Sequence, residues 1–204
     1  MTEASDGKLL ELWAAGDAEA GQQLFQRYFA TVRRFFRHKV GDEIEDLVQQ
    51  TFLGCIEAQG RYRGDASFKT FLLAIARNQL FKHYRKSAQQ AAPDFSTHSL
   101  RDLRTSPTGV IARRQEEQAL ALALQAVPVD MQIAVELAYW EDLDVAEIAA
   151  VLEVPLHTVY SRLRRARILL REILALPPGA PGPIPLLDDL EAWSQRVRVR
   201  ASEQ

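Results

Sequence analysis

Residues 143–167 read LDVAEIAAVLEVPLHTVYSRLRRAR and predict two helices joined by a tight turn. Asp144 stands where it can cap a short first helix, and Glu153-Val154 supplies the turn. Pro155 follows at a first-turn position, where the missing backbone amide costs nothing. The predicted buried face of the second helix recurs at steps of four, three and four residues: Val159, Leu163, Ala166 and Leu170. The pattern is that of a helix-turn-helix.

The opposite side of this second helix is polar and basic in its first turns. Side chains in that position meet base edges and phosphates when the helix lies in the major groove of DNA. The predicted DNA-facing residues are Thr158, Tyr160, Ser161, Arg162, Arg164 and Arg165. An ordinary helical hairpin with a solvated basic face has the same pattern. The motif therefore indicates DNA binding but does not identify the machinery that uses it.

The charges of the chain are distributed unevenly. Its formal net charge is −2, which argues weakly against a general nucleic-acid binder. However, Ser67–Lys86 and Pro155–Arg171 each contain five Lys or Arg residues and no acid, whereas Glu141–Glu153 is acidic. This distribution predicts two local surfaces that face phosphate.

Composition limits the class of protein. The chain has 204 residues, of which 47% are hydrophobic and 25% are charged, as in an ordinary globular protein. Its single cysteine, Cys55, excludes an intramolecular disulfide, is expected to be buried on a helix, and suits a reducing cytosol. The sequence shows neither a secretory signal nor an apolar stretch long enough to span a membrane. We therefore expect a cytoplasmic protein without membrane insertion.

The whole chain is predicted to be all-α, because no stretch shows sustained alternation of apolar and polar residues. Two small domains are expected, an N-terminal helical bundle over 7–87 and the helix-turn-helix domain over 110–176. Residues 88–109 are rich in Ala, Gln, Ser, Thr and Pro, and Phe95, Leu100 and Leu103 are too sparse there to build a core, so this segment is expected to be a flexible linker. Residues 177–204 form a proline-rich extension with a possible short helix. The expected helices run approximately over 8–15, 17–39, 42–60, 67–87, 110–126, 130–140, 145–152 and 156–176.

The helix expected to start after Gly41-Asp42 carries one apolar residue outside its core stripe. The stripe consists of Ile44, Leu47, Val48, Thr51, Phe52, Cys55 and Ile56. Leu53 falls off it, among the polar side chains of Asp46, Gln49, Gln50 and Glu57. An exposed leucine often has no meaning, but one ringed by polar groups also suits a protein contact.

The next helix changes character along its length. Phe68, Phe71, Leu72 and Ile75 lie on one face, and beyond Ala76 the residues become basic and aromatic. Aromatic rings with cationic neighbours hold unstacked bases. A helix that continues past its core in this way is expected to bind a nucleic-acid strand.

Several of these stretches resemble a known family. The segments DLVQQTF (46–52), RYRGDASFKTFL (61–72) and IARN (75–78) are similar to the −10-binding domain of extracytoplasmic-function (ECF) sigma factors of the sigma-70 family. The segments VP (127–128), AEIA (146–149) and TVYSRLRRAR (158–167) resemble the −35-binding domain of that family. The resemblance covers roughly 7–87 and 110–175, in the order and at the spacing of the family.

The resemblance implies a transcription-initiation subunit that binds core RNA polymerase, recognises the −10 and −35 promoter elements, and helps to melt the −10 region. Contacts with the −10 element are implied for Arg61, Tyr62, Arg63, Ser67, Lys69, Phe71, Arg77, Asn78, Lys82 and Arg85. Core polymerase is implied to bind through its clamp helices, at Asp46, Gln49, Gln50 and Leu53, and through its flap. An anti-sigma factor is a further expected partner.

The chain departs from the family pattern at three positions. Phe71 stands where the family often has Trp, and Tyr160 replaces a frequent Lys or Arg. Glu153 occupies the turn where Gly is common, so the turn either accepts a strained left-handed conformation or has a different shape.

Two other classes of function fit the sequence less well. An enzyme is disfavoured, because no phosphate-binding loop, nucleophile elbow or cluster of metal ligands is present in the sequence, so no catalytic residue, metal or cofactor is expected. A stand-alone helix-turn-helix regulator would explain residues 143–167, but it leaves the N-terminal bundle over 7–87 without a role.

Overall fold

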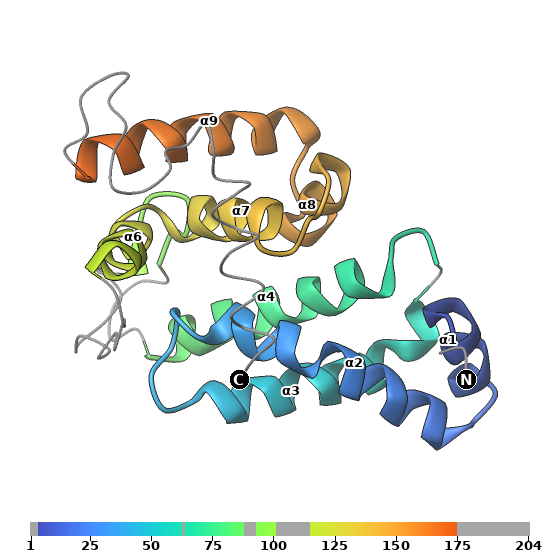
Figure 1. Cartoon of the computed structure of the whole chain (residues 1–204). Helices are drawn as coiled ribbons and strands as arrows, with labels where there is room; N and C mark the ends of the chain where they lie inside the picture. The colour runs from blue at the N-terminus through green and yellow to red at the C-terminus, as the bar shows by residue number, and fades with distance from the viewer. Residues whose placement is uncertain (1–3, 63, 88–92, 101–114, 175–204) are drawn as a thin grey trace. The chain divides into compact units, whose positions relative to one another are not determined.

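The computed structural model describes residues 4–62, 64–87, 93–100 and 115–174, which belong to two compact units, 1–83 and 84–204. The described residues form helices and no strand, apart from one isolated bridge between Ser99 and Pro128. Figure 1 shows the helices in chain order, from blue α1 to orange α9. The predicted all-α class is confirmed.

The first unit contains α1 (Asp6–Ala14), α2 (Ala18–Phe36), α3 (Ile44–Ala58), a short 3-10 helix (Gln59–Arg61) and most of α4 (Phe68–Ser87). The predicted cap of α2 is confirmed, since Asp17 Oδ1 accepts hydrogen bonds from the amides of Glu19 and Ala20 at 2.9 and 3.2 Å. The predicted cap of α3 at Asp42 is wrong. That helix begins at Ile44 after Glu43, whose side chain makes no capping bond.

Helices α1, α2 and α3 of the first unit pack in sequence, α1 on α2 and α2 on α3. A Cβ atom at Gly21 would lie 2.7 Å from the Trp13 ring, so glycine lets α1 approach α2 closely. The buried apolar residues include Leu9, Leu24, Val32, Phe36, Leu47, Val48, Phe68, Leu72 and Leu80. Cys55 is fully buried as expected, and burial raises the pKa of its thiol to about 12.

The apolar face of α4 extends further than the sequence suggested. Leu80, Phe81 and Tyr84 are all buried, so the expectation that the core pattern stops at Ala76 is wrong. The helical period continues through these residues, while Lys82 and Arg85 occupy the exposed side. Basic and buried residues therefore alternate around the same turns of α4.

The second unit contains α6 (Gln115–Gln125), α7 (Val129–Tyr139), α8 (Val145–Leu152) and α9 (Leu156–Ile173). Helix α7 packs against α8 and α9, α8 packs against α9, and α6 contacts α7 and α9. One core cluster consists of Leu120, Ala123, Leu124, Val127, Met131, Val135, Ala166 and Leu170.

Part of the predicted linker is packed in the second unit. Phe95 and Leu100 are 5% and 0% exposed, so the expectation that they are too sparse to join a core is wrong. The amides of Val129 and Asp130 at the start of α7 donate hydrogen bonds to the backbone oxygens of His98 and Phe95. These bonds hold residues 93–100 against the second unit, so widely spaced apolar side chains can still be buried there. Residues 88–92 and 101–109 of the predicted linker, and the predicted extension 177–204, lie outside the described residues.

Candidate nucleic-acid interface

The helix-turn-helix begins with a reciprocal cap at α8. Asp144 Oδ1 accepts a hydrogen bond from the Glu147 amide at 2.8 Å, and Glu147 Oε2 accepts one from the Asp144 amide at 3.1 Å. The predicted cap at Asp144 is therefore confirmed, with Glu147 as a second member. Such a capping box satisfies two amides that the first turn of a helix leaves without partners.

The turn between α8 and α9 adopts the strained alternative. Glu153 has φ 54° and ψ 45°, in the left-handed region that favours glycine. The amide of Val154 donates to Ala149 O at 3.1 Å, which closes the end of α8. Pro155 then precedes α9 in an extended conformation, as its N-cap rather than as its first helical residue.

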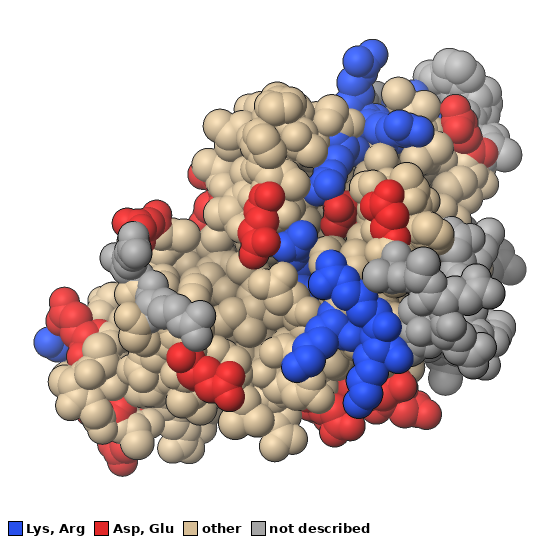
Figure 2. Space-filling view, turned by 180° about the vertical axis from the view of Figure 1, so that it is seen from behind, with Lys and Arg blue, Asp and Glu red and all other residues tan. Residues whose placement is uncertain are grey.

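Helix α9 has one buried and one exposed face. Val159, Ala166 and Leu170 are buried, and Leu163 is half-buried, as predicted. Most of the predicted DNA-facing residues lie on the other side: Tyr160, Ser161, Arg164 and Arg165 are exposed, with Tyr160 at 62%. On the face drawn in Figure 2, most of the Lys and Arg side chains gather into groups.

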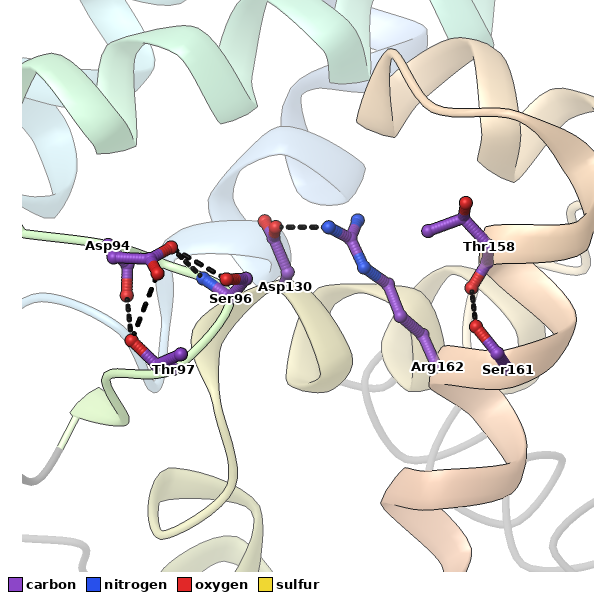
Figure 3. Close-up of polar contacts among 7 residues, drawn as sticks. All are labelled: Asp94, Ser96, Thr97, Asp130, Thr158, Ser161 and Arg162. Atoms are coloured by element: carbon purple, nitrogen blue, oxygen red, sulfur yellow. Dashed lines mark hydrogen bonds and ion pairs between the residues drawn. The ribbon is translucent and has the colours of Figure 1, made fainter.

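Two predicted residues of α9 are less exposed than expected. Thr158 is half-buried, and its backbone oxygen accepts a hydrogen bond from the Ser161 hydroxyl at 2.9 Å. Arg162 was expected on the exposed side, but its side chain is only 14% exposed and forms an ion pair with Asp130 of α7 at 2.7 Å. Figure 3 shows both contacts. The charge of Arg162 suggested a DNA-facing position, because the sequence does not reveal that the carboxylate of Asp130 lies next to it.

The loop before α4 is closed by its own side chains. The Tyr62 hydroxyl donates to Ala66 O at 2.7 Å, and Gly64 has φ +77°, which a residue with a Cβ rarely adopts. Ser67 Oγ accepts a hydrogen bond from the Thr70 amide at 3.2 Å and caps the first turn of α4. The side chains of Arg61 and Arg63 lie outside the described residues.

An aromatic cluster connects this loop to the rest of the first unit. The Phe68 ring lies at its centre, with ring-centroid distances of 6.5 Å to Trp13, 5.4 Å to Tyr28 and 6.3 Å to Tyr62. Tyr62 also contacts Phe71 at 5.0 Å. Burial, and secondarily the charge of Asp6, raise the pKa of Tyr62, so the hydroxyl stays protonated at neutral pH. Tyr62 and Phe71, the two aromatic residues predicted to contact bases, are therefore partly packed in the core.

The predicted strand-binding residues of α4 differ in solvent exposure. Asn78, Lys82 and Arg85 are exposed, whereas Lys69 and Arg77 are half-buried. The guanidinium of Arg77 lies over the Phe81 ring at 4.5 Å and donates to Asn78 Oδ1 at 3.3 Å. The structure therefore brings Arg77 and Asn78 together on the helix surface.

A second exposed surface lies on α3. All the predicted polymerase-contacting residues, Asp46, Gln49, Gln50 and Leu53, are exposed, with Leu53 at 51%. Ile56 is also 48% exposed, so its expected place in the core stripe is wrong. The signal that could have found it is its spacing, because Ile56 lies one turn from Leu53 on the same side of the helix.

Two family models match this arrangement: sigma-70 region 2 over residues 24–90 and sigma-70 region 4 over residues 117–178. The RNA polymerase sigma-H factor of Pseudomonas aeruginosa is 31% identical over 179 residues, which cover 82% of this chain and 92% of that protein. The chain belongs to the sigma-70 family of RNA polymerase sigma factors. The family predicted from the sequence is confirmed.

Other relatives identify this sigma factor as one of the ECF type. The ECF RNA polymerase sigma-E factor of Escherichia coli K12 is 29% identical over 174 residues, covering 80% of this chain and 91% of that protein. The fold also resembles two solved structures of sigma factors. CnrH, in complex with the cytosolic domain of CnrY, has a TM-score of 0.60 at 24% identity and covers 83% of this chain and 97% of its own. RpoE of Bartonella quintana, in complex with the anti-sigma factor NepR, has a TM-score of 0.55 at 21% identity, with 76% and 96% covered.

Family membership gives the general role of the protein. It is a promoter-recognising sigma factor that works with core RNA polymerase, in a family of non-catalytic initiation factors. A stand-alone regulator would leave the region 2 match without explanation. Within the described residues, no group of His, Cys, Asp and Glu could hold a metal ion, and no helix is long and apolar enough to cross a bilayer.

Proposed function

We propose that the two units of this sigma factor recognise separate promoter elements in the cytoplasm, without catalysing a reaction themselves. The domain over 7–87 binds and opens the −10 element, and the domain over 110–176 binds the −35 element as intact duplex. The observation that carries the proposal is the exposed polar face of α9, which follows a capped α8 and a closed turn. No cofactor is needed, because RNA polymerase supplies the catalysis.

The proposed −35 contacts are those residues of α9 whose side chains can reach a major groove. Arg164 and Arg165 are exposed and suit guanine or phosphate. Tyr160 presents an aromatic ring where the family frequently has a cation, so the −35 preference should differ from that of relatives with Lys or Arg there. We also propose phosphate contacts for Thr158 and Ser161, because their hydroxyl groups can bond phosphate oxygens.

The proposed −10 contacts surround the loop before α4. Tyr62 and Phe71 offer ring faces for an unstacked base, and Asn78, Lys82 and Arg85 continue along α4 toward the upstream edge. Contacts with the −10 element are also proposed for Arg61, Arg63, Ser67, Lys69 and Arg77. Preferential binding of the open strand supplies the free energy for melting, in concert with polymerase.

Core polymerase is proposed to bind the exposed surface of α3. Leu53 and Ile56 form an apolar centre, and Asp46, Gln49 and Gln50 surround it with polar groups. An apolar centre with a polar rim is the usual anatomy of a protein interface. We assign this surface to the clamp helices of the largest subunit, and a separate contact of the second domain to the flap.

An anti-sigma factor is proposed as the regulatory partner. The solved RpoE structure contains the anti-sigma factor NepR, and the solved CnrH structure contains the cytosolic domain of CnrY. We expect that a protein other than polymerase, cross-linked to this chain in cells, competes with core polymerase for binding to the chain. A cross-linked partner that binds the holoenzyme without displacing the sigma factor would contradict this role.

The direct test is transcription with purified bacterial core polymerase. The chain should start transcription at specific promoters from a genomic library, and footprints should cover both the −10 and −35 regions. Protection of duplex DNA by the chain alone, with no effect of core enzyme, would favour the stand-alone regulator instead.

The polymerase surface is tested by Leu53→Asp, with Phe29→Asp as the matched control. Both residues are large, apolar and exposed in the first unit, at 51% and 45%. Leu53→Asp should weaken binding to core polymerase at unchanged helicity, whereas Phe29→Asp should leave binding unchanged. Equal effects of the two variants would mean that any added charge disturbs the unit.

A further inference from the structure

The start of α7 is capped from outside the helix. Its N-cap is Pro128, which has no side-chain hydrogen bond to offer. The amides of the first helical turn therefore need other acceptors. The Val129 amide donates to His98 O at 3.0 Å, and the Asp130 amide donates to Phe95 O at 3.1 Å. Backbone carbonyls of residues 93–100 thus replace the missing cap.

This segment, residues 93–100, has a fixed local shape. Asp94 Oδ1 accepts hydrogen bonds from the Ser96 amide at 2.9 Å and the Ser96 hydroxyl at 2.7 Å, and Oδ2 accepts one from Thr97 at 3.2 Å. These hydrogen bonds, that of the Ser96 side chain first, lower the pKa of Asp94, so the carboxylate stays ionised at neutral pH. The Phe95 ring is buried beside Tyr84, with 6.4 Å between ring centroids.

The same turn of α7 also forms an ion pair with α9. The side chain of Asp130 pairs with Arg162 at 2.7 Å, and the two side chains are 9% and 14% exposed. A buried ion pair of this kind is costly to break, so it restricts how α9 can rotate and slide on α7. Figure 3 shows the hydrogen bonds within the Asp94 turn, the Asp130–Arg162 ion pair, and the hydrogen bond between Ser161 and Thr158 on α9.

We propose that Phe95 and Asp130 are positioning residues for promoter recognition, and that Arg162 acts through this pair instead of reading a base. Residues 93–100 hold the first turn of α7, and that turn sets the orientation of α9 through Arg162. The segment lies between the two family matches, which end at residue 90 and begin at residue 117. The −35-binding unit therefore depends on residues outside the region 4 match. This inference rests on the proposed −35 contact of α9.

The first test measures amide exchange and −35 preference in full-length Phe95→Ala, with Phe95→Leu as the conservative variant and Phe29→Ala as the control. In Phe95→Ala, the amides of Val129 and Asp130 should lose protection while those of Val159 and Ala166 keep it. The holoenzyme should then lose about tenfold of its preference for an intact over a scrambled −35 element, which is the size of one lost base contact. Phe95→Leu should restore most of the preference, and Phe29→Ala should change nothing.

The second test separates positioning from direct contact at Arg162. Loss of a phosphate contact reduces the slope of the logarithm of the binding constant against the logarithm of the salt concentration by about one. Loss of positioning lowers the affinity at every salt concentration and leaves this slope unchanged. Arg162→Met should therefore weaken −35-dependent binding at an unchanged salt slope. Asp130→Asn should weaken it as well, and the double variant should lose no more than either single variant.

The outcomes distinguish the two proposals. If wild-type holoenzyme shows no −35 preference, the assignment of α9 itself fails. If wild type shows the preference and Phe95→Ala keeps it despite exposed Val129 and Asp130 amides, only the positioning role fails. A reduced salt slope in Arg162→Met, or increased affinity in Asp130→Asn, would make Arg162 a direct DNA contact. If α9 also loses protection in Phe95→Ala, the Asp130→Asn variant decides the positioning role, and an unchanged −35 preference in that variant would overturn it.

Discussion

The two units place their candidate DNA-binding residues differently relative to the core. In the first unit, Tyr62 and Phe71 belong to the aromatic cluster around Phe68, so the surface proposed to hold a melted strand is continuous with the core. In the second unit, Tyr160, Arg164 and Arg165 project from α9 into solvent while separate aliphatic residues form the core. Stability and recognition should therefore be coupled in the first unit and separable in the second.

The largest effect is expected from Phe68→Ala in the first unit. Phe68 is 2% exposed and contacts rings from α1, α2 and the loop, so the variant should lose about 3–5 kcal/mol of unfolding free energy. Urea denaturation measures this loss. The exposed Phe29→Ala is the control and should change the free energy by less than about 0.5 kcal/mol. If the two variants were equally stable, Phe68 would not be the centre of the cluster.

The second expected effect tests separability in the second unit. Arg165→Ala should cost roughly 1–3 kcal/mol in promoter binding if the side chain reads a base edge, because a bidentate contact is lost. Competition between promoter variants for the holoenzyme measures this cost. The free energy of unfolding should stay unchanged, since Arg165 is exposed. An unchanged −35 preference would remove Arg165 from the interface.

A smaller effect is expected from Asp144→Ala at the start of α8. The variant removes the acceptor for the Glu147 amide and should cost about 1 kcal/mol of unfolding free energy. Thermal or chemical denaturation measures the change. Glu147→Gln keeps a side chain that can accept from the Asp144 amide and should cost less; a larger cost for it would mean that charge, and not the cap, stabilises this end.

An effect of similar size but opposite sign is expected at Glu153. Glu153→Gly should stabilise the second unit by about 1 kcal/mol, because glycine adopts the left-handed conformation without a Cβ clash. Glu153→Ala is the matched control and should bring no gain. Stabilisation by alanine equal to that by glycine would show that the Glu153 side chain, not the backbone, carries the strain.

The sequence by itself determined the helical class, the helix-turn-helix, the cap at Asp144 and the separation of basic stretches. These features depend on local spacing, capping chemistry and helical periodicity, which neighbouring residues along the chain decide. The resemblance to ECF sigma factors likewise rested on short motifs in a fixed order. The exposure of Leu53 followed from its place off the apolar stripe of α3.

Only the tertiary structure decided which polar and apolar residues meet across the chain. Arg162 looks like its exposed neighbours in the sequence, but Asp130, more than thirty positions earlier, pairs with it. Phe95 and Leu100 are sparse in the sequence but buried in the fold, where their segment is hydrogen-bonded to the start of α7. Burial depends on which elements pack together, and long-range packing leaves little trace in local periodicity.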